Sequence, residues 1–382
     1  MIPYGKQDIN QADIDAVTAV LKSDFLTQGP QVPAFEKAVA AHTNAAYAVA
    51  VNSATSALHI GCLALGLKSG DSLWTTPNSF VASANCGLYC GAKVDFVDID
   101  PATYNLCPEQ LKAKLATAKQ PPKVLVVVHF GGEPCDMEAI AALAKQYKFQ
   151  VIEDASHAIG GRYQDQPIGN CQYSALTVFS FHPVKIVTTA EGGVITTRSK
   201  EVAERLGELR SHGITRNPER MTKAPDGPWY YQQIELGLNY RMTELQAALG
   251  CSQLQRLDEF VARRQQLADQ YDELLAGLPV RSQQRNGNNY SALHLYVVEV
   301  PATSRRAVFE SLREQGIGVN VHYIPIHTQP YYQGVGFREG DFPAAEHYYS
   351  GAISLPLYAT LTDAEQQEVV AALRHALTEH AS

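Results

Sequence analysis

Residues 123–156, KVLVVVHFGGEPCDMEAIAALAKQYKFQVIEDAS, decide the fold class. The run VLVVV at 124–128 and the segment FQVI at 149–152 are continuous and apolar, which is typical of buried strands. Between them, DMEAIAALAKQY at 136–147 has the apolar spacing of a helix. This strand–helix–strand order indicates a parallel sheet covered by helices on both faces.

The same alternation extends outward through the first two thirds of the chain. Strand-like runs at 46–51, 72–76 and 93–99 are each followed by a helical pattern, and two more strands are expected at 173–180 and 193–197. A long helix is expected from residue 242 to about 275, and further helices at 304–315 and 362–378. The sequence therefore predicts a large α/β domain at residues 1–250 and a small α+β domain at 251–382.

Composition excludes several classes of function. The chain has 382 residues, 45% hydrophobic and 18% charged, which is typical of a two-domain globular protein. Its net charge of −8 argues against broad binding to nucleic acid or to a membrane surface. We expect neither a signal peptide nor a membrane span, because no apolar run approaches ~20 residues. The seven cysteines contain no CxxC motif, so we expect reduced thiols, no metal site and a cytoplasmic location.

The first chemical candidate is Lys185 in VFSFHPVKIVTTAEGG at 178–193. A lysine after an apolar strand and before a Gly-Gly turn lies where side chains converge at the edge of a parallel sheet. Ser180 and His182 flank the same turn and offer a hydroxyl and an imidazole. The alternative is an ordinary surface lysine.

The second candidate is Asp154, which ends the strand in VIEDASHAIG at 151–160. A buried carboxylate at the carboxyl end of a strand needs a cationic partner, because an unpaired buried charge is costly. One suitable partner is the protonated ring nitrogen of pyridoxal 5′-phosphate (PLP). The alternative is a helix N-cap.

Three further segments fit the same cofactor. In VNSATSALHIG at 51–61, Ser53 and Thr55 stand where a strand gives way to a helix, and a helix N-terminus with adjacent hydroxyls is suited to phosphate. In TTPNSFVASAN at 75–85, the ring of Phe80 could stack on a flat cofactor, although an isolated Phe is more often a core residue. Asn239 and Arg241 lie in a turn before the long helix, where capping is the alternative.

These segments resemble the DegT/StrS-type sugar aminotransferases, a branch of the fold-type I PLP enzymes. The resemblance runs from LTQGPQVPAFE at 26–36 to AISLPLYATLT at 352–362, and it rests on NSATSAL, EDASHAIG, SFHPVK followed by EGG, and LGLNYRMTELQAALG. It implies a fold-type I homodimer whose cofactor alternates between PLP and pyridoxamine phosphate. Relatives that act as dehydratases have histidine in place of the cofactor lysine, so Lys185 favours transamination.

The resemblance also assigns roles. It implies that Lys185 forms the Schiff base with the cofactor, that Asp154 binds the pyridine nitrogen and that His157, where many members have Gln, lies near the cofactor's phenolic oxygen. The other implied cofactor contacts are Ser53, Ala54, Thr55, Phe80, Ser180 and Asn239, the last reaching across the dimer interface. Expected substrate contacts are Tyr4, Asp24, Phe25, Leu26, Thr27, His182, Arg216, Asn239, His322 and Tyr323. We expect Asn239 and Arg216 to be donated to the partner's site.

ASHAIG, TTAEGG, VHYIPIH and AISLP look most like the subgroup that acts in pseudaminic acid synthesis. That resemblance implies transfer of an amino group from glutamate, which leaves as 2-oxoglutarate, to C4 of UDP-4-keto-6-deoxy-N-acetyl-β-L-altrosamine. Two alternatives remain. One is amination of another keto sugar nucleotide, such as an arabinose or perosamine precursor, and the other is a cofactor-binding regulatory module without turnover.

Overall fold

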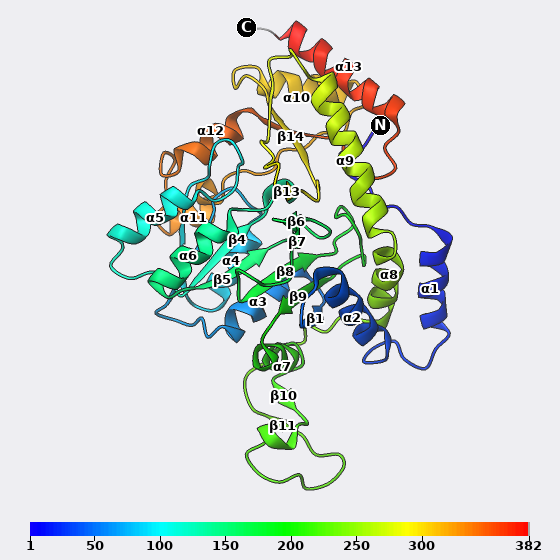
Figure 1. Ribbon diagram of the computed structural model, residues 1–382, viewed down its shortest axis with the longest axis vertical. Helices are drawn as coiled ribbons and strands as arrows, with labels where there is room; N and C mark the ends of the chain where they lie inside the picture. Colours follow the sequence, from blue (N-terminus) through cyan, green and yellow to red (C-terminus); the bar gives the residue numbers. More distant parts are fainter. Residues whose placement is uncertain (381–382) are drawn as a thin grey trace.

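The computed structural model describes residues 1–380, with a large sheet flanked by helices and a smaller sheet beside it (Figure 1). The large sheet has seven strands in the order β1-β9-β8-β5-β4-β2-β3. Their bounds are β1 Tyr47–Val51, β2 Ser72–Thr75, β3 Lys93–Phe96, β4 Val124–Val128, β5 Gln150–Asp154, β8 Leu176–Ser180 and β9 Gly193–Thr197. Strand β9 is antiparallel to both neighbours, and the other paired strands are parallel. The predicted mostly parallel sheet is confirmed.

Alternate residues of each strand face opposite layers of helices. Val124 and Val126 of β4 belong to the same buried cluster as helices α3 (Ala54–Ala64), α4 (Ala82–Tyr89) and α7 (Lys200–Leu209). Leu125 and Val127 pack instead with α5 (Pro108–Thr117) and α6 (Met137–Tyr147). On that second face, α2 (Gln31–Thr43) and α8 (Glu244–Leu254) cover β8 and β9. Because helices cover both faces, every residue of β4 is buried, which explains its unbroken apolar run.

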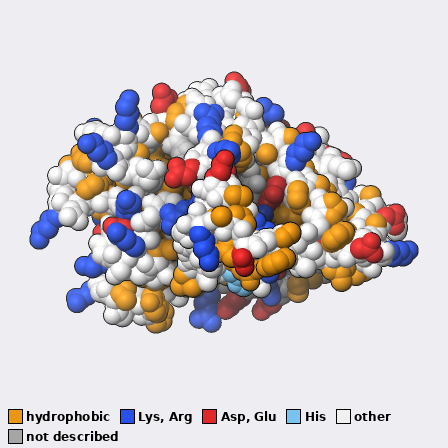
Figure 2. All heavy atoms as spheres, turned by 90° about the horizontal axis from the view of Figure 1, so that it is seen from below, with side chains coloured by type: hydrophobic (Ala, Val, Ile, Leu, Met, Phe, Trp, Pro, Cys, Tyr) orange, Lys and Arg blue, Asp and Glu red, His pale blue; other side chains and the backbone are white. Residues whose placement is uncertain are grey.

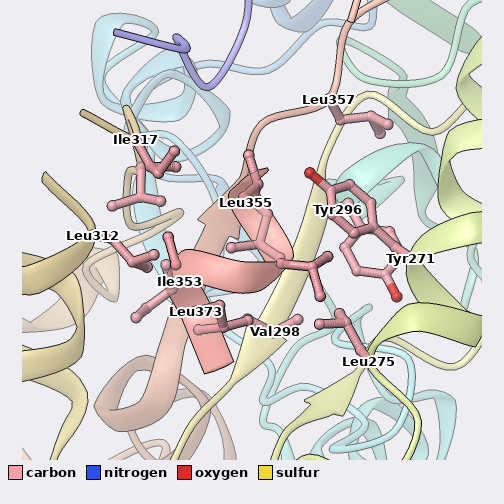
Figure 3. Packing of buried hydrophobic residues seen from close by; sticks show 14 of the residues in the cluster. Tyr271, Leu275, Tyr296, Val298, Leu312, Ile317, Ile353, Leu355, Leu357 and Leu373 are labelled. Atoms are coloured by element: carbon pink, nitrogen blue, oxygen red, sulfur yellow. The ribbon is translucent and has the colours of Figure 1, made fainter. Parts of the chain in front are cut away.

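The smaller sheet consists of the antiparallel strands β12 (Arg281–Ser282), β14 (Tyr296–Glu299) and β15 (Ala352–Leu355). Helices α9 (Leu257–Leu274), α10 (Arg305–Glu314) and α13 (Asp363–Glu379) contribute to the core beside it. Figure 3 shows this core, where the rings of Tyr271 and Tyr296 lie together, 4.7 Å between centroids. Helices α10 and α13 agree with the predicted segments to within one residue at each end.

The predicted single helix from 242 to 275 is wrong: the structure has two helices, α8 and α9, separated by Gln255 and Arg256. The backbone of Arg256 leaves the helical range at φ −105° and ψ 7°. Its guanidinium binds Asp8 and Asp13 near the N-terminus, at 2.6 and 2.7 Å. No Gly or Pro marks this break in the sequence, so it accompanies contacts between distant parts of the chain rather than a local signal.

The remaining elements are short or lie at the periphery. They are α1 (Gln11–Leu21), β6 (Arg162–Tyr163), β7 (Gln166–Pro167), β10 (Ile214–Thr215), β11 (Gln232–Gln233), β13 (Asn289–Tyr290), α11 (Pro330–Gly334), α12 (Pro343–Gly351) and the 3-10 turns η1 (Phe130–Gly132), η2 (Pro218–Arg220) and η3 (Ile326–Thr328). Strands β10 and β11 form a hairpin that projects from one end of the molecule (Figure 1). None of the helices within residues 1–380 has the length and apolar character to cross a membrane.

Candidate active site

A cavity of about 450 Å³ lies at the carboxyl ends of the parallel strands. Val128, Asp154 and Ser180, the last residues of β4, β5 and β8, all line it. The first residues of α3, which follows β1, line the same cavity. In open α/β sheets this edge is the usual ligand site, because the turns that leave the strands converge there.

Asp154 presents a buried carboxylate to this cavity, with only 5% of the residue exposed. Its Oδ2 accepts a hydrogen bond from the Ser83 hydroxyl at 2.7 Å, and its Oδ1 accepts one from the Ser156 amide at 3.2 Å. Within the described chain no Lys, Arg or His forms an ion pair with it, and the element that follows β5 is the strand β6. The helix-cap alternative is therefore wrong. A buried carboxylate that forms no direct ion pair is suited to a cationic group on a ligand.

Lys185 lies in the loop between β8 and β9 and lines the same cavity. Its Nζ is 3.5 Å from Nε2 of His294. Burial of the ammonium lowers the pKa of Lys185 to about 8, and the negative charge of Asp154 acts in the opposite direction. A larger share of this amine is neutral near pH 7 than at a surface lysine, which favours nucleophilic attack and proton transfer.

The lining of the cavity at the start of α3 offers donors for an anion. Ser53 is the N-cap of α3 and accepts a hydrogen bond from the Ser56 amide at 3.1 Å, while Ala54 and Thr55 form the first turn. First-turn amides have no acceptor within their own helix, so they are available to a ligand. Gly193 approaches this turn so closely that a Cβ there would lie 2.6 Å from the Ser53 carbonyl oxygen. This donor set, with the Ser180 hydroxyl, suits a phosphate.

Aromatic and imidazole rings form another wall. Phe80 precedes α4 and lines the cavity, 58% exposed, with its ring centroid 6.4 Å from that of Tyr323. His157 accepts a hydrogen bond from the Gly131 amide on Nδ1, at 3.3 Å, and its Nε2 lies 3.1 Å from the Tyr323 hydroxyl. Burial and the nearby charge of Lys185 lower the pKa of His157. The ring is therefore neutral, and Nε2 donates to Tyr323.

Three more of the expected substrate contacts line the cavity, namely Tyr4, His182 and His322. The rings of Tyr4 and His322 lie 5.4 Å apart, and burial followed by the charge of Lys185 lowers the pKa of His322 to about 3. His182 lies at the rim, 4.0 Å from the carboxylate of Glu191.

The structure adds residues that sequence reasoning missed. His294 lines the cavity beside Lys185, and Ser83 holds Asp154. His294 lies in the apolar run LHLYVV, where no local signal marks it as a site residue. Ser83 lies in α4 and is 71 positions from Asp154, a pairing that only the fold reveals.

Six expected site residues lie outside the cavity of the single chain: Asp24, Phe25, Leu26, Thr27, Arg216 and Asn239. Phe25 and Leu26 are 53% and 51% exposed, and Asn239 is also exposed. Arg216 follows β10 in the projecting hairpin, where its guanidinium lies 5.5 Å from the ring of Tyr231 (Figure 1). The residues that line the cavity include no arginine.

These observations fit PLP. The Schiff-base chemistry of the cofactor needs an amine such as that of Lys185, its ring nitrogen needs a carboxylate such as that of Asp154, and its phosphate needs the donors at the start of α3. All three occur in one cavity, which defines the class as a PLP-dependent enzyme of the fold-type I architecture.

Comparison with known proteins identifies the family. Residues 7–374 match the model of the DegT/DnrJ/EryC1/StrS aminotransferase family, and the chain belongs to that family. It is 38% identical over 380 residues to the spore coat polysaccharide biosynthesis protein SpsC of Bacillus subtilis, covering 98% of this chain and 96% of SpsC. It is 37% identical over 367 residues to UDP-4-amino-4,6-dideoxy-N-acetyl-β-L-altrosamine transaminase of Campylobacter jejuni, covering 94% and 93%.

Comparison with solved structures gives the same family. PseC of Helicobacter pylori, an aminotransferase involved in the biosynthesis of pseudaminic acid, superposes with a TM-score of 0.91 at 30% identity, over 99% of each chain. A sugar aminotransferase of Streptococcus pneumoniae in its PLP form gives 0.91 at 27% identity, over 100% of each chain. The chain is therefore a PLP-dependent sugar aminotransferase, as predicted. The alternative of a non-catalytic module is wrong.

Proposed function

We propose that this enzyme transfers an amino group from glutamate to C4 of UDP-4-keto-6-deoxy-N-acetyl-β-L-altrosamine, in pseudaminic acid synthesis. The observation that carries the proposal is similarity along nearly the whole chain to two proteins of that pathway, the Campylobacter transaminase and PseC. The sequence motifs around His157, Ala190 and His322 support the same subgroup.

In this proposal PLP, when bound, withdraws electrons from the reacting carbon so that a proton can leave it. The Lys185 amine holds the cofactor and, once displaced, accepts the proton from the α-carbon of glutamate. In the second half-reaction Lys185 delivers a proton to C4 of the sugar. Asp154 would keep the ring nitrogen protonated throughout, and His157, whose Nε2 donates to the Tyr323 hydroxyl, would lie near the phenolic oxygen of the cofactor.

The phosphate and ring contacts complete the assignment. Ser53, Ala54, Thr55 and Ser180 would bind the phosphate, and Phe80 would stack on the ring, because all five line the cavity. Of the remaining candidates, Tyr4, His182, His322 and Tyr323 are suited to the sugar nucleotide, because they line the same cavity.

We also propose that the enzyme is a homodimer with composite sites. A glutamate donor and a UDP-sugar bring several negative charges, yet within residues 1–380 no arginine lines the cavity of one chain. The projecting hairpin carries Arg216 and exposes Trp229, Tyr231 and Leu236 at 70%, 50% and 85%. Figure 2 views the molecule from the hairpin end and shows hydrophobic side chains beside Lys and Arg on that face. A second copy could cover this face and receive Arg216.

In the same dimer, Asn239 and the segment of Asp24, Phe25, Leu26 and Thr27 would reach the partner's cavity. The test mixes two inactive variants, Lys185→Ala and Asn239→Asp, and allows their subunits to exchange. A composite site predicts that mixed dimers regain activity at one of two sites, because one cavity then has both native groups. If mass measurement confirms exchange and no activity returns, Asn239 serves its own chain.

A different keto sugar is the second candidate, since SpsC, a spore coat polysaccharide protein, is as similar as the Campylobacter transaminase. Turnover over a panel of UDP- and dTDP-linked keto sugars, including arabinose and perosamine precursors, separates the two. Selective amination of the altrosamine precursor supports the proposal, and preference for another sugar overturns it. A cytoplasmic location belongs to the proposal as well, and the seven free cysteines are compatible with it.

A further inference from the structure

His294 has no assigned role, although its ring lies within hydrogen-bonding reach of the side-chain amine of Lys185. It lies between β13 and β14 and is 4% exposed. Its Nε2 is 3.5 Å from Nζ of Lys185, which is long for a hydrogen bond and typical of sites that tighten when a ligand is bound. Its ring centroid lies 4.4 Å from that of His157.

The backbone around His294 is fixed by buried contacts. Arg264 of α9 is 2% exposed, and its Nη1 donates to the carbonyl oxygens of Leu293, His294 and Leu357 at 3.2, 3.3 and 2.9 Å. Leu293 adopts a positive φ of 51°, which is costly for a bulky residue and must be stabilised by its surroundings.

On the other side, Gly132 (φ 102°) allows the turn after β4 to approach this segment. A Cβ on Gly132 would lie 2.7 Å from the Leu293 amide nitrogen and 2.9 Å from the His157 carbonyl oxygen. The backbone that carries His294 is therefore held on both sides, with Nε2 of the ring 3.5 Å from the lysine amine.

The charges around His294 keep it neutral. Burial lowers its pKa most, and the positive charges of Lys185 and Arg264 and the rings of His157 and His322 act in the same direction. Within residues 1–380, the carboxylate that raises the pKa of Lys185 is that of Asp154. A neutral imidazole has one acceptor nitrogen, and the lysine ammonium can only donate, so Nε2 accepts and Nδ1 carries the proton. Nδ1 has no hydrogen-bond partner within the described chain.

We propose that His294 is a positioning residue for Lys185: its neutral ring accepts a hydrogen bond from the lysine ammonium through Nε2 and directs the amine into the cavity. This rests on the proposed function, in which Lys185 holds the cofactor. The hydrogen bond stabilises the charged form of the lysine, so its loss shifts the amine toward the neutral form.

The test measures the capture of PLP by cofactor-free protein, by absorbance, as a function of pH. The rate depends on the free amine, so its inflection reports the lysine rather than turnover. We expect the inflection in His294→Leu to fall by about one pH unit, because a hydrogen bond to a charged group is lost. His294→Gln, which keeps an acceptor at the same reach, should stay near the wild type. If the leucine variant fails to fold, His294→Asn replaces it, because its shorter side chain withdraws the acceptor.

His327→Gln is the matched control. His327 is also buried, at 0% exposure, and also has an unpartnered Nδ1, but it lies outside the cavity. The pH inflection of PLP capture by His327→Gln should equal that of the wild type. An unchanged inflection in folded His294→Leu, or an equal shift in His294→Gln, overturns the proposal. Lys185→Ala distinguishes failure of the His294 proposal from failure of the proposed function. Covalent capture of PLP by that variant would contradict the assignment of Lys185 itself.

Discussion

Glu153 and Asp154 are consecutive residues of β5, and both are 5% exposed, but their carboxylates lie in opposite surroundings. Glu153 faces the α5 and α6 layer, where its Oε2 accepts from His129 at 2.8 Å and its Oε1 accepts from the Ser174 and Thr177 hydroxyls. Because Nδ1 of His129 accepts from the Cys135 amide, that ring donates to Glu153 as a neutral imidazole.

Asp154 faces the other layer, accepts two neutral hydrogen bonds and lines the cavity. Burial would raise the pKa of Glu153, but its donors lower it overall. Burial alone therefore does not mark a functional carboxylate. The distinguishing features of Asp154 are the open cavity that its carboxylate lines and the reactive lysine beside it.

The largest expected effect tests the lysine beside Asp154. Lys185→Ala removes the nucleophile and the proton carrier together, so turnover should fall by ~10³-fold or more. The variant should still bind PLP through the phosphate contacts, which equilibrium dialysis can measure. Turnover close to that of the wild type would contradict the assignment.

The next effect distinguishes the two neighbours on β5 directly. Asp154→Asn keeps the size of the side chain but removes the negative charge that keeps the ring nitrogen of PLP protonated. The rate at which the proton leaves glutamate should therefore fall roughly 100-fold. Stopped-flow measurement with α-deuterated glutamate isolates that step. Normal rates with normal cofactor retention would mean that Asp154 is only a structural residue.

A smaller effect is expected at the phosphate end. Gly193→Ala would place a Cβ 2.6 Å from Ser53 and displace the first turn of α3. We expect PLP affinity to weaken about tenfold, because the amides no longer converge on the phosphate. Gly207→Ala in helix α7 is the control, since a Cβ at that position meets nothing within 4 Å. Equal affinity for PLP in the two variants would contradict the placement of the phosphate at this turn.

The smallest effect on catalysis, with a clear effect on stability, is expected at Glu153. Glu153→Gln should lower the free energy of unfolding by about 2 kcal/mol, because a buried charged hydrogen-bond network is broken, while turnover at low temperature stays within about twofold. Urea unfolding and an activity assay measure the two quantities. A large loss of turnover in folded Glu153→Gln would mean that Glu153, like Asp154, is needed for catalysis.

The same residue gives a pH test. The folded-state pKa of Glu153 is lowered, so its contribution to stability is present above its ordinary pKa and is lost as the pH falls through the folded value. Wild-type protein should therefore lose more unfolding free energy than Glu153→Gln as the pH falls below about 4.5. Parallel acid profiles for the two proteins would exclude this contribution.

Local sequence patterns were enough to predict the strands of the large sheet and the position of its carboxylate. Strand β9 was expected at 193–197 and is found there, and Asp154 lies at the carboxyl end of its strand. The break at Arg256 was not predictable, because its partners Asp8 and Asp13 are more than 240 positions away. His294 and Ser83 were missed because their partners are also distant in the chain. The domain boundary at residue 250, the roles of the site residues and the composite dimer stay predictions.

Covalent trapping shows directly whether the lysine beside the carboxylate at the end of β5 holds the cofactor. The holoenzyme is reduced with borohydride, digested and analysed by mass spectrometry. The account predicts that one peptide gains the mass of the reduced cofactor and that fragmentation places it on Lys185, in wild-type protein and also in Glu153→Gln. Trapping on another lysine, or equal trapping in Lys185→Ala, would contradict the account.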